Sequence, residues 1–364
     1  MVTKTEHGRV NDNPALLELM MEDWDQAGAR EELTGNLVDF YDSFVQSLRE
    51  ESLKTNIGLA IRGITGVNGC DLPPSQRTLA RMSQDPSMED ILEAARKLLR
   101  FTEQNPGAKV LPYELSLDDL NYSAFRMCEL YGQLHGAASI RDIEMSKAHY
   151  PEYVFSVDAR NYSYIFLYSY ISYVYCSRFI DFNTIDNVIE LGPGAGRQVE
   201  VIKKYHPNLN FYLVDLAPTL YLCYQYLNSI FPDDIMPYTS TREGERIQLT
   251  DERKIAFVGN GDMDRVSPVG TSLSICSAVL GLMTPVNATK YLEKMSSYSD
   301  YIFMIESRGD NSKGTYALDD SACLDDFERI FDGKYDLVHR EAAFYPLSVR
   351  EGFGGFEMMM WAKS

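Results

Sequence analysis

Acidic residues and glycines stand at the ends of two predicted strands, in a pattern that can bind a nucleotide-like ligand. Residues 187–191 are apolar except for Asn187 and Glu190, as expected for a short buried strand. The glycines that follow are Gly192, Gly194 and Gly196. Such a turn can take positive φ and lets a ligand approach the backbone without meeting a Cβ. Asp215 ends the next predicted strand, nineteen residues after Gly196, where nucleotide-binding folds place the acid that holds ribose hydroxyls.

Two kinds of cofactor compete for this unit: a nicotinamide or flavin nucleotide, and S-adenosylmethionine. The third glycine of G-x-G-x-x-G is absent, because Arg197 stands three residues after Gly194, and this disfavours a pyrophosphate. Glu190 lies two residues before the first glycine, where a carboxylate can bind a cationic amino group. The segment E-L-G-P-G-A-G resembles the first motif of the class I S-adenosylmethionine-dependent methyltransferases. A nicotinamide site and a purely structural turn remain the alternatives.

The resemblance implies a set of cofactor contacts and an α/β fold with a Rossmann-like seven-stranded methyltransferase sheet. Glu190 would act on the methionine ammonium, directly or through water, and the glycine turn would pass under the cofactor. Asp215, followed by Leu216, would accept hydrogen bonds from the ribose. The G-D-M segment after the third predicted strand looks like the adenine site of small-molecule O-methyltransferases, with Asp262 as acceptor and the Met263 thioether against the ring.

A narrower resemblance covers about residues 140 to 305. An aromatic segment, then V-I-E-L-G-P-G-A-G-R, then L-V-D-L-A-P is similar to the bacterial sugar O-methyltransferases of polyketide and surface-glycan pathways. That family has Ser-Phe-x-Glu-Met after its fourth strand, whereas residues 276–283 read C-S-A-V-L-G-L-M here. The methyltransferase interpretation does not depend on this stretch, but the sugar acceptor does.

The segment before the glycine motif, from residue 150 to 175, is crowded with tyrosine and phenylalanine. Residues 161–178 are predicted to form a helix that either joins two domains as a buried element or supplies an aromatic wall for the ligand. Tyr162 and Tyr168 are the candidates for such a wall.

Methyl transfer needs a nucleophile held in line, and a hydroxyl nucleophile also needs a base. His149 precedes the aromatic segment and is the histidine best placed for this role, ahead of His135 and of His339 in a terminal strand. Glu306 ends the fifth predicted strand, at the edge where α/β sheets bind ligands, and is an equal candidate as base or substrate anchor. No metal site is expected, since Asp262 and its acidic neighbour alone are poor ligands.

Composition narrows the partners. The 364-residue chain carries a formal charge of −19 and has a sequence pI near 4.7, which disfavours a nucleic-acid partner. No apolar run reaches eighteen residues and the first residues are polar, so we expect no membrane segment and a cytoplasmic protein. The six cysteines stand singly, as free thiols do.

The pattern of predicted elements divides the chain. Residues 1–150 read as a helical domain, with helices starting near residues 14, 31, 88 and 117, which would act as a lid or pair two chains as a homodimer. Residues 151–185 form an aromatic linking helix. In residues 186–364 strands alternate with helices and end in two adjacent strands, as expected for an α/β sheet covered on both faces and closed by an antiparallel hairpin.

The sequence therefore predicts an S-adenosylmethionine-dependent methyltransferase acting on a small molecule. Oxygen is the expected acceptor, in a sugar, phenolic or polyketide-type hydroxyl of a secondary metabolite or glycan. A small-molecule N-methyltransferase is the nearest alternative, because no residue identifies the acceptor atom. An NAD-dependent oxidoreductase and a non-catalytic binding module are the others.

Overall fold

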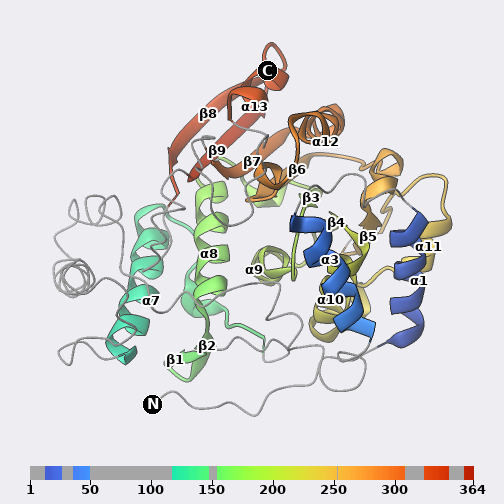
Figure 1. The fold of residues 1–364 in the computed structure, drawn as a ribbon. Helices are drawn as coiled ribbons and strands as arrows, with labels where there is room; N and C mark the ends of the chain where they lie inside the picture. The colour runs from blue at the N-terminus through green and yellow to red at the C-terminus, as the bar shows by residue number, and fades with distance from the viewer. Residues whose placement is uncertain are drawn as a thin grey trace.

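The computed structural model describes residues 13–26, 36–49, 117–146, 154–251, 253–307, 324–343 and 356–364. Its largest element is a sheet (Figure 1). The strands of that sheet are β3 (Asn187–Leu191), β4 (Asn210–Asp215), β5 (Ile255–Gly259), β6 (Ser272–Ser277), β7 (Tyr301–Ser307), β8 (Tyr335–Ala342) and β9 (Phe356–Lys363). They are hydrogen-bonded in the order β5-β4-β3-β6-β7-β9-β8.

The first five of these strands run parallel, and β9 is antiparallel to both β7 and β8. The chain moves outward from β3 to β4 and β5, then returns to β6 on the other side of β3. The order therefore reverses between β3 and β6, and α/β sheets bind ligands at the carboxyl edge of such a switch point. This confirms the predicted α/β class and the Rossmann-like sheet of seven strands, including its antiparallel end.

Helices cover both faces of the sheet, as the alternation of elements predicted. The helices are α1 (Pro14–Gln26), α3 (Asn36–Ser47), α7 (Leu117–Leu134), α8 (Tyr164–Ser177), α9 (Arg197–Tyr205), α10 (Ala217–Ile230), α11 (Tyr238–Glu243), α12 (Pro285–Tyr298) and α13 (Leu324–Phe331). Apolar side chains of α8, α9 and α10 share one core with Val188 and Phe211. Those of α12 and α13 share a second core with the alternate strand residues Ile189 and Tyr212, because successive strand residues face opposite sides.

The amino-terminal helices join the first of these cores. Leu17 and Met20 of α1 and Phe125 of α7 are fully buried in it. Figure 1 shows α1 and α3 beside α10, and α7 beside α8. The predicted start of α1 is confirmed, since the Asn13 side chain accepts from the Leu16 N–H at 3.1 Å and caps the helix.

The aromatic segment differs from its prediction at its start. The helix begins at Tyr164 rather than near 161, because Ser163 caps it by accepting from the Phe166 N–H at 3.3 Å. The preceding residues form a small hairpin of β1 (Phe155–Val157) and β2 (Arg160–Tyr162). Asp158 and Ala159 turn it with φ of 51° and 65°. Without Asn-Gly or Asp-Gly at this turn, the sequence lacks the usual hairpin signal.

Other local predictions had mixed outcomes. The helix predicted near 31–53 is described only over Asn36–Ser47, and the one predicted near 88 lies outside the described residues. The stretch 242–254 is mostly charged, yet its Ile247 and Leu249 are buried. The reason is tertiary: the Leu249 N–H donates to the buried Tyr212 hydroxyl at 2.8 Å.

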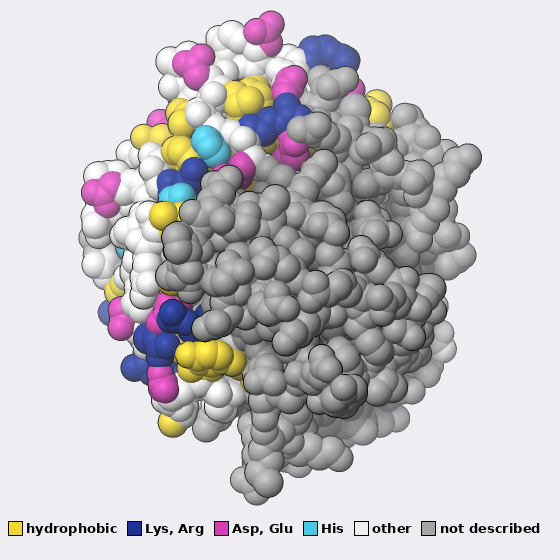
Figure 2. All heavy atoms as spheres, turned by 90° about the vertical axis from the view of Figure 1, so that its left-hand side faces the viewer, with side chains coloured by type: hydrophobic (Ala, Val, Ile, Leu, Met, Phe, Trp, Pro, Cys, Tyr) yellow, Lys and Arg dark blue, Asp and Glu magenta, His cyan; other side chains and the backbone are white. Residues whose placement is uncertain are grey.

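The surface of the described part carries side chains of both charges (Figure 2), and its cysteines are free thiols. On the face shown in Figure 2, Lys and Arg side chains of the described part lie beside Asp and Glu side chains. Cys128, Cys176, Cys223 and Cys276 are buried free thiols. Within the described ranges, no helix combines the length and the apolar character that crossing a membrane requires.

Candidate active site

The sheet register brings the predicted ligand-binding residues to one edge. Leu191, the last residue of β3, pairs with Val214 of β4, so the glycine turn and Asp215 follow neighbouring strand ends. Asp215 in turn pairs with Gly259 of β5, which leads directly into the short helix Asn260–Arg265. Three segments far apart in sequence thus meet at the carboxyl edge of adjacent parallel strands, beside the switch point.

The glycine turn is held in a left-handed conformation and is open above its middle. The φ values of Gly192, Gly194 and Gly196 are 70°, 55° and 80°, a region that only glycine enters readily. A Cβ on Gly192 would lie 2.5 Å from the Val279 side chain, and one on Gly196 would lie 2.9 Å from Leu227. A Cβ on Gly194 would meet no described atom within 4 Å. The turn is therefore packed at both ends and exposes its central backbone to a free space.

Glu190 is a buried acid whose hydrogen bonding is incomplete. Glu190 is the next-to-last residue of β3 and is 3% exposed. Its Oε2 has no hydrogen-bond partner among the described residues. Burial, and then the nearby charge of Asp215, raise the pKa of Glu190 to about 8. An unpaired buried carboxyl group is unfavourable unless a cation or a donor reaches it. The site therefore offers an acceptor for a cationic group of a ligand.

Asp215 is partly buried, and the backbone satisfies part of its hydrogen bonding. Its Oδ1 accepts from the Leu216 N–H at 2.7 Å and its Oδ2 accepts from the Gly194 N–H at 3.3 Å. Burial raises the pKa of Asp215 to about 7, although these two hydrogen bonds oppose the rise. Each carboxylate oxygen keeps further acceptor capacity, which can serve hydroxyl groups above the turn. Leu216 contributes its backbone N–H, which orients this carboxylate.

The predicted adenine residues divide into an accessible acid and a buried thioether. Asp262 is half-exposed and its Oδ2 lies 3.2 Å from Arg265 Nη2. Burial raises the pKa of Asp262, and the charge of Arg265 opposes this. Met263 is 4% exposed and shares a core with side chains of α12. Its side chain therefore anchors the short helix Asn260–Arg265 to that core. Arg265 could not be identified from the sequence, because an arginine three residues after an acid gives no distinctive signal.

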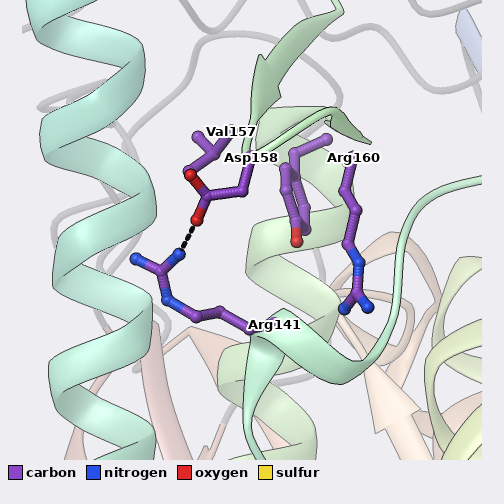
Figure 3. Close-up of a pocket in the computed structure, with 5 residues that line it drawn as sticks. Arg141, Val157, Asp158 and Arg160 are labelled. Carbon is purple, nitrogen blue, oxygen red and sulfur yellow. Dashed lines mark hydrogen bonds and ion pairs between the residues drawn. The ribbon is translucent and has the colours of Figure 1, made fainter.

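The two predicted tyrosines lie in different places. The Tyr168 hydroxyl is 3.3 Å from Ser277 Oγ, at the end of β6 and so at the ligand edge. The Tyr162 hydroxyl donates instead to the Ile140 and Ile143 carbonyls, at 3.3 and 3.2 Å. Tyr162 lines another cavity, of about 250 Å³, together with Arg141, Val157, Asp158 and Arg160 (Figure 3). The structure thus brings Tyr168 to the candidate site and does not bring Tyr162 there.

Glu306 holds the loop that follows β6. Its Oε1 accepts from the Val279 and Leu280 N–H groups, both at 2.8 Å, and its Oε2 accepts from the Gly281 N–H at 3.3 Å. Burial raises the pKa of Glu306 to about 7, against the effect of these three hydrogen bonds. The preceding Ala278 has a φ of 54°, a strained value for a residue with a Cβ.

Glu306 is 1% exposed and accepts three backbone N–H groups from one loop, which supports a positioning role; its predicted role as base or substrate anchor stays a prediction. The loop that Glu306 holds packs Val279 against Gly192. This loop therefore connects the end of β6 with the glycine turn. His149, the other predicted base, lies outside the described residues. Among the residues that are described, no group of three or more His, Cys, Asp or Glu side chains is arranged to hold a metal ion.

Neither a protein-family model nor a curated protein matches the chain. Solved structures similar to it include the magnesium protoporphyrin IX methyltransferase of Synechocystis with bound S-adenosylhomocysteine, at 14% identity and a TM-score of 0.33, over 49% of this chain and 74% of that one. The mitomycin 7-O-methyltransferase is 13% identical with a TM-score of 0.37, over 79% and 71%.

An O-methyltransferase of neocarzinostatin biosynthesis, solved with S-adenosylmethionine and 2-hydroxy-5-methyl naphthoic acid, is 14% identical with a TM-score of 0.38. The alignment covers 55% of this chain and 55% of that one, so the chain spans about half its length. With likenesses this distant, the chemistry of the site has to come from its own residues.

The open space above Gly194 generates a first prediction. Gly194→Ala should fold with a loss of about 1 to 2 kcal/mol from left-handed strain, yet lose binding of S-adenosylhomocysteine because the methyl group enters the ligand space. Gly192→Ala is the comparison variant. It introduces the same backbone strain and also a clash with Val279, so its free energy of unfolding should fall further. Thermal unfolding and calorimetric titration of both variants measure this. Undiminished binding by a folded Gly194→Ala protein would contradict it.

The buried acids generate a second prediction. The pKa values of Glu190, Asp215 and Glu306 are all higher in the folded protein than the ordinary carboxyl values near 4. Their contribution to stability is therefore fully present below about pH 4 and is lost as the pH rises through 7 to 8. The melting temperature of the ligand-free protein should fall across this range.

Glu190→Gln isolates one of these groups, since the amide resembles the neutral acid. The variant should match the wild type near pH 5 and exceed its melting temperature at pH 8. Glu245→Gln, which alters an exposed carboxylate, is the control and should show no comparable gain. Equal melting curves of wild type and Glu190→Gln at both pH values would refute the placement of an unsatisfied acid here.

The loop after β6 generates a third prediction. In Glu306→Gln the amide oxygen can still accept from Val279 and Leu280, but the amide nitrogen faces the Gly281 N–H; in Glu306→Ala all three donors lose their acceptor. Hydrogen exchange of a peptide spanning residues 278–283 should therefore be slowest in the wild type, faster in the Gln variant and fastest in the Ala variant. A peptide from α10 is the internal control. The same exchange rate in all three proteins would remove the positioning role.

Proposed function

We propose that this protein is a methyltransferase that uses S-adenosylmethionine to modify a small molecule. The observation that carries the proposal is Glu190, a buried carboxyl group with an unpartnered oxygen, placed two residues before an open glycine turn. A ligand that binds there has to bring a cation to Glu190 and has to tolerate a close approach to Gly194. The methionine ammonium of S-adenosylmethionine meets the first need, and the open turn supports the second.

The second acid fits the remainder of the cofactor. Asp215 keeps acceptor capacity after binding two backbone amides, which suits the two ribose hydroxyls. Asp262, farther along the same edge, is half-exposed and suits the adenine amino group. The missing third glycine of G-x-G-x-x-G argues against a pyrophosphate at this turn, and so against the nicotinamide alternative.

S-adenosylmethionine, when bound, supplies an activated methyl group on a sulfonium. The protein then has to place an acceptor in line and exclude water, and well-oriented proximity can supply effective molarities of roughly 10⁵ to 10⁸ M. The loop held by Glu306 and the pair Tyr168–Ser277 stand on the acceptor side of the switch point. Tyr168 brings a hydroxyl to the end of β6, and His149 stays our proposed base.

The loop that follows β6 supports a chemical class for the methyl acceptor. Between residues 278 and 283 every side chain is apolar, and Leu282, at the end of the loop, is 39% exposed. Such a wall favours an apolar ring, so within the predicted substrates we propose a phenolic or polyketide-type hydroxyl over a sugar. An amphipathic acceptor of this kind needs few polar contacts beyond the reacting oxygen.

Calorimetric titration tests the cofactor class. The purified protein should bind S-adenosylmethionine and S-adenosylhomocysteine with micromolar affinity and should not bind NADH. Because the pKa of Glu190 is about 8 without ligand, this group is mostly protonated at pH 7 and should release its proton when the ammonium binds. Affinity should therefore rise between pH 6 and 8, and titrations in buffers of different ionisation enthalpy should report up to one proton released.

Glu190→Gln is the matched variant for that experiment. It should weaken S-adenosylhomocysteine roughly 10- to 100-fold, as expected for the loss of a charged hydrogen bond, and it should abolish the proton release. Binding of NADH alone would overturn the proposal, and so would a wild-type protein that binds neither sulfur compound. Labelled S-adenosylmethionine with phenolic acceptors then tests turnover.

A further inference from the structure

The amino-terminal helices reach the edge of the sheet where Asp215 lies. The hydroxyl of Tyr41, on α3, is 3.1 Å from Oγ1 of Thr219, and Thr219 is a buried residue in the first turn of α10, four residues after Asp215. Burial, and then the charge of Asp215, raise the pKa of Tyr41. The phenol therefore contacts the first turn of α10, four residues after the carboxylate that we assign to the ribose, although Tyr41 and Asp215 are far apart in the sequence.

Helix α1 fixes Tyr41 in this position. The rings of Trp24 and Tyr41 lie 5.6 Å apart, which ties α3 to α1. At the start of α1, the Asn13 N–H donates to the Tyr221 hydroxyl of α10 at 3.0 Å. Two helices from the first fifty residues thus pack as one unit against α10.

The same unit is linked to the adenine side of the edge. Asp23, on α1, accepts from the Tyr238 hydroxyl at 2.7 Å and from Arg242 Nε at 2.8 Å. The Arg242 carbonyl accepts from Arg265 Nη1 at 2.9 Å, and Arg265 pairs with Asp262. Side chains from α1 and α3 are therefore connected to both acids that we assign to the adenosine half of the cofactor.

We propose that Tyr41 is a cofactor-binding residue that completes the ribose subsite together with Asp215 and Thr219. This inference rests on the proposed function. A carboxylate only accepts hydrogen bonds, whereas each ribose hydroxyl both donates and accepts. Asp215 can accept hydrogen bonds from the ribose hydroxyls, but the lone pairs of the ribose oxygens need a hydrogen-bond donor. The hydroxyl pair of Tyr41 and Thr219 provides one at the same place.

The two ends of the cofactor can be tested separately. S-adenosylhomocysteine carries both the adenosine and the amino acid, whereas 5′-methylthioadenosine carries the adenosine and lacks the ammonium. Tyr41→Phe should weaken both ligands by about 3- to 10-fold, the size expected for one hydrogen bond. Glu190→Gln should weaken only S-adenosylhomocysteine. Thr219→Val removes the other hydroxyl and should reproduce the effect of Tyr41→Phe on both ligands.

Tyr221→Phe is the matched control. It makes the same substitution and removes a hydroxyl that also ties the amino-terminal segment to α10, but Tyr221 lies two residues from Thr219 and so on another face of that helix. Its affinity for both ligands should equal that of the wild type.

The outcomes separate this inference from the proposed function. Unchanged affinity for both ligands in folded Tyr41→Phe and Thr219→Val would overturn the role of Tyr41, while wild-type binding of S-adenosylhomocysteine would leave the proposed function standing. An equal loss in Tyr221→Phe would also overturn it, because general docking of the helices would then explain the effect. A wild type that binds neither ligand would remove the proposed function itself.

Discussion

The burial of carboxyl groups at one edge of a parallel sheet is the constraint on which the rest of this structure depends. Glu190, Asp215 and Glu306 all lie at the ends of buried strands, and burial raises the pKa of each. Asp215 and Glu306 offset that cost by binding backbone amides of the two loops beside the switch point. Among the described residues, none partners Oε2 of Glu190, and under our proposal a cationic ligand completes the edge.

Apolar packing on both faces makes such an edge tolerable. One core joins the sheet to α8, α9 and α10, and the other joins it to α12 and α13. A buried polar cluster attaches the segment before the aromatic helix to α9: Glu200 accepts from the Ser146 N–H at 2.7 Å, from Lys204 Nζ at 2.6 Å and from the Tyr226 hydroxyl. The cluster is well satisfied, as buried charge has to be, and it fixes α9 behind the glycine turn.

The amino-terminal helices have a part in the site as well as in the core. They pack on α10 and α11, the elements that follow Asp215 and precede β5, and they carry Tyr41 and Asp23 to the adenosine side of the edge. That the helical segment 1–150 acts as a lid or pairs two chains stays a prediction, and the contacts of α1 and α3 support the lid.

Local sequence determined the elements of the α/β part and the positions of the glycines and acids. The bounds of α9, Arg197–Tyr205, and of β4, Asn210–Asp215, were predictable because apolar spacing, glycines and a His-Pro stop act within a few residues. Only the tertiary structure decided which groups these residues meet. Tyr162 lines a cavity away from the candidate site. Glu306 accepts from the amides of a loop more than twenty residues earlier, and Tyr41 contacts Thr219, 178 positions away. Such pairs depend on strand order and helix packing, and no periodicity in a single sequence records them.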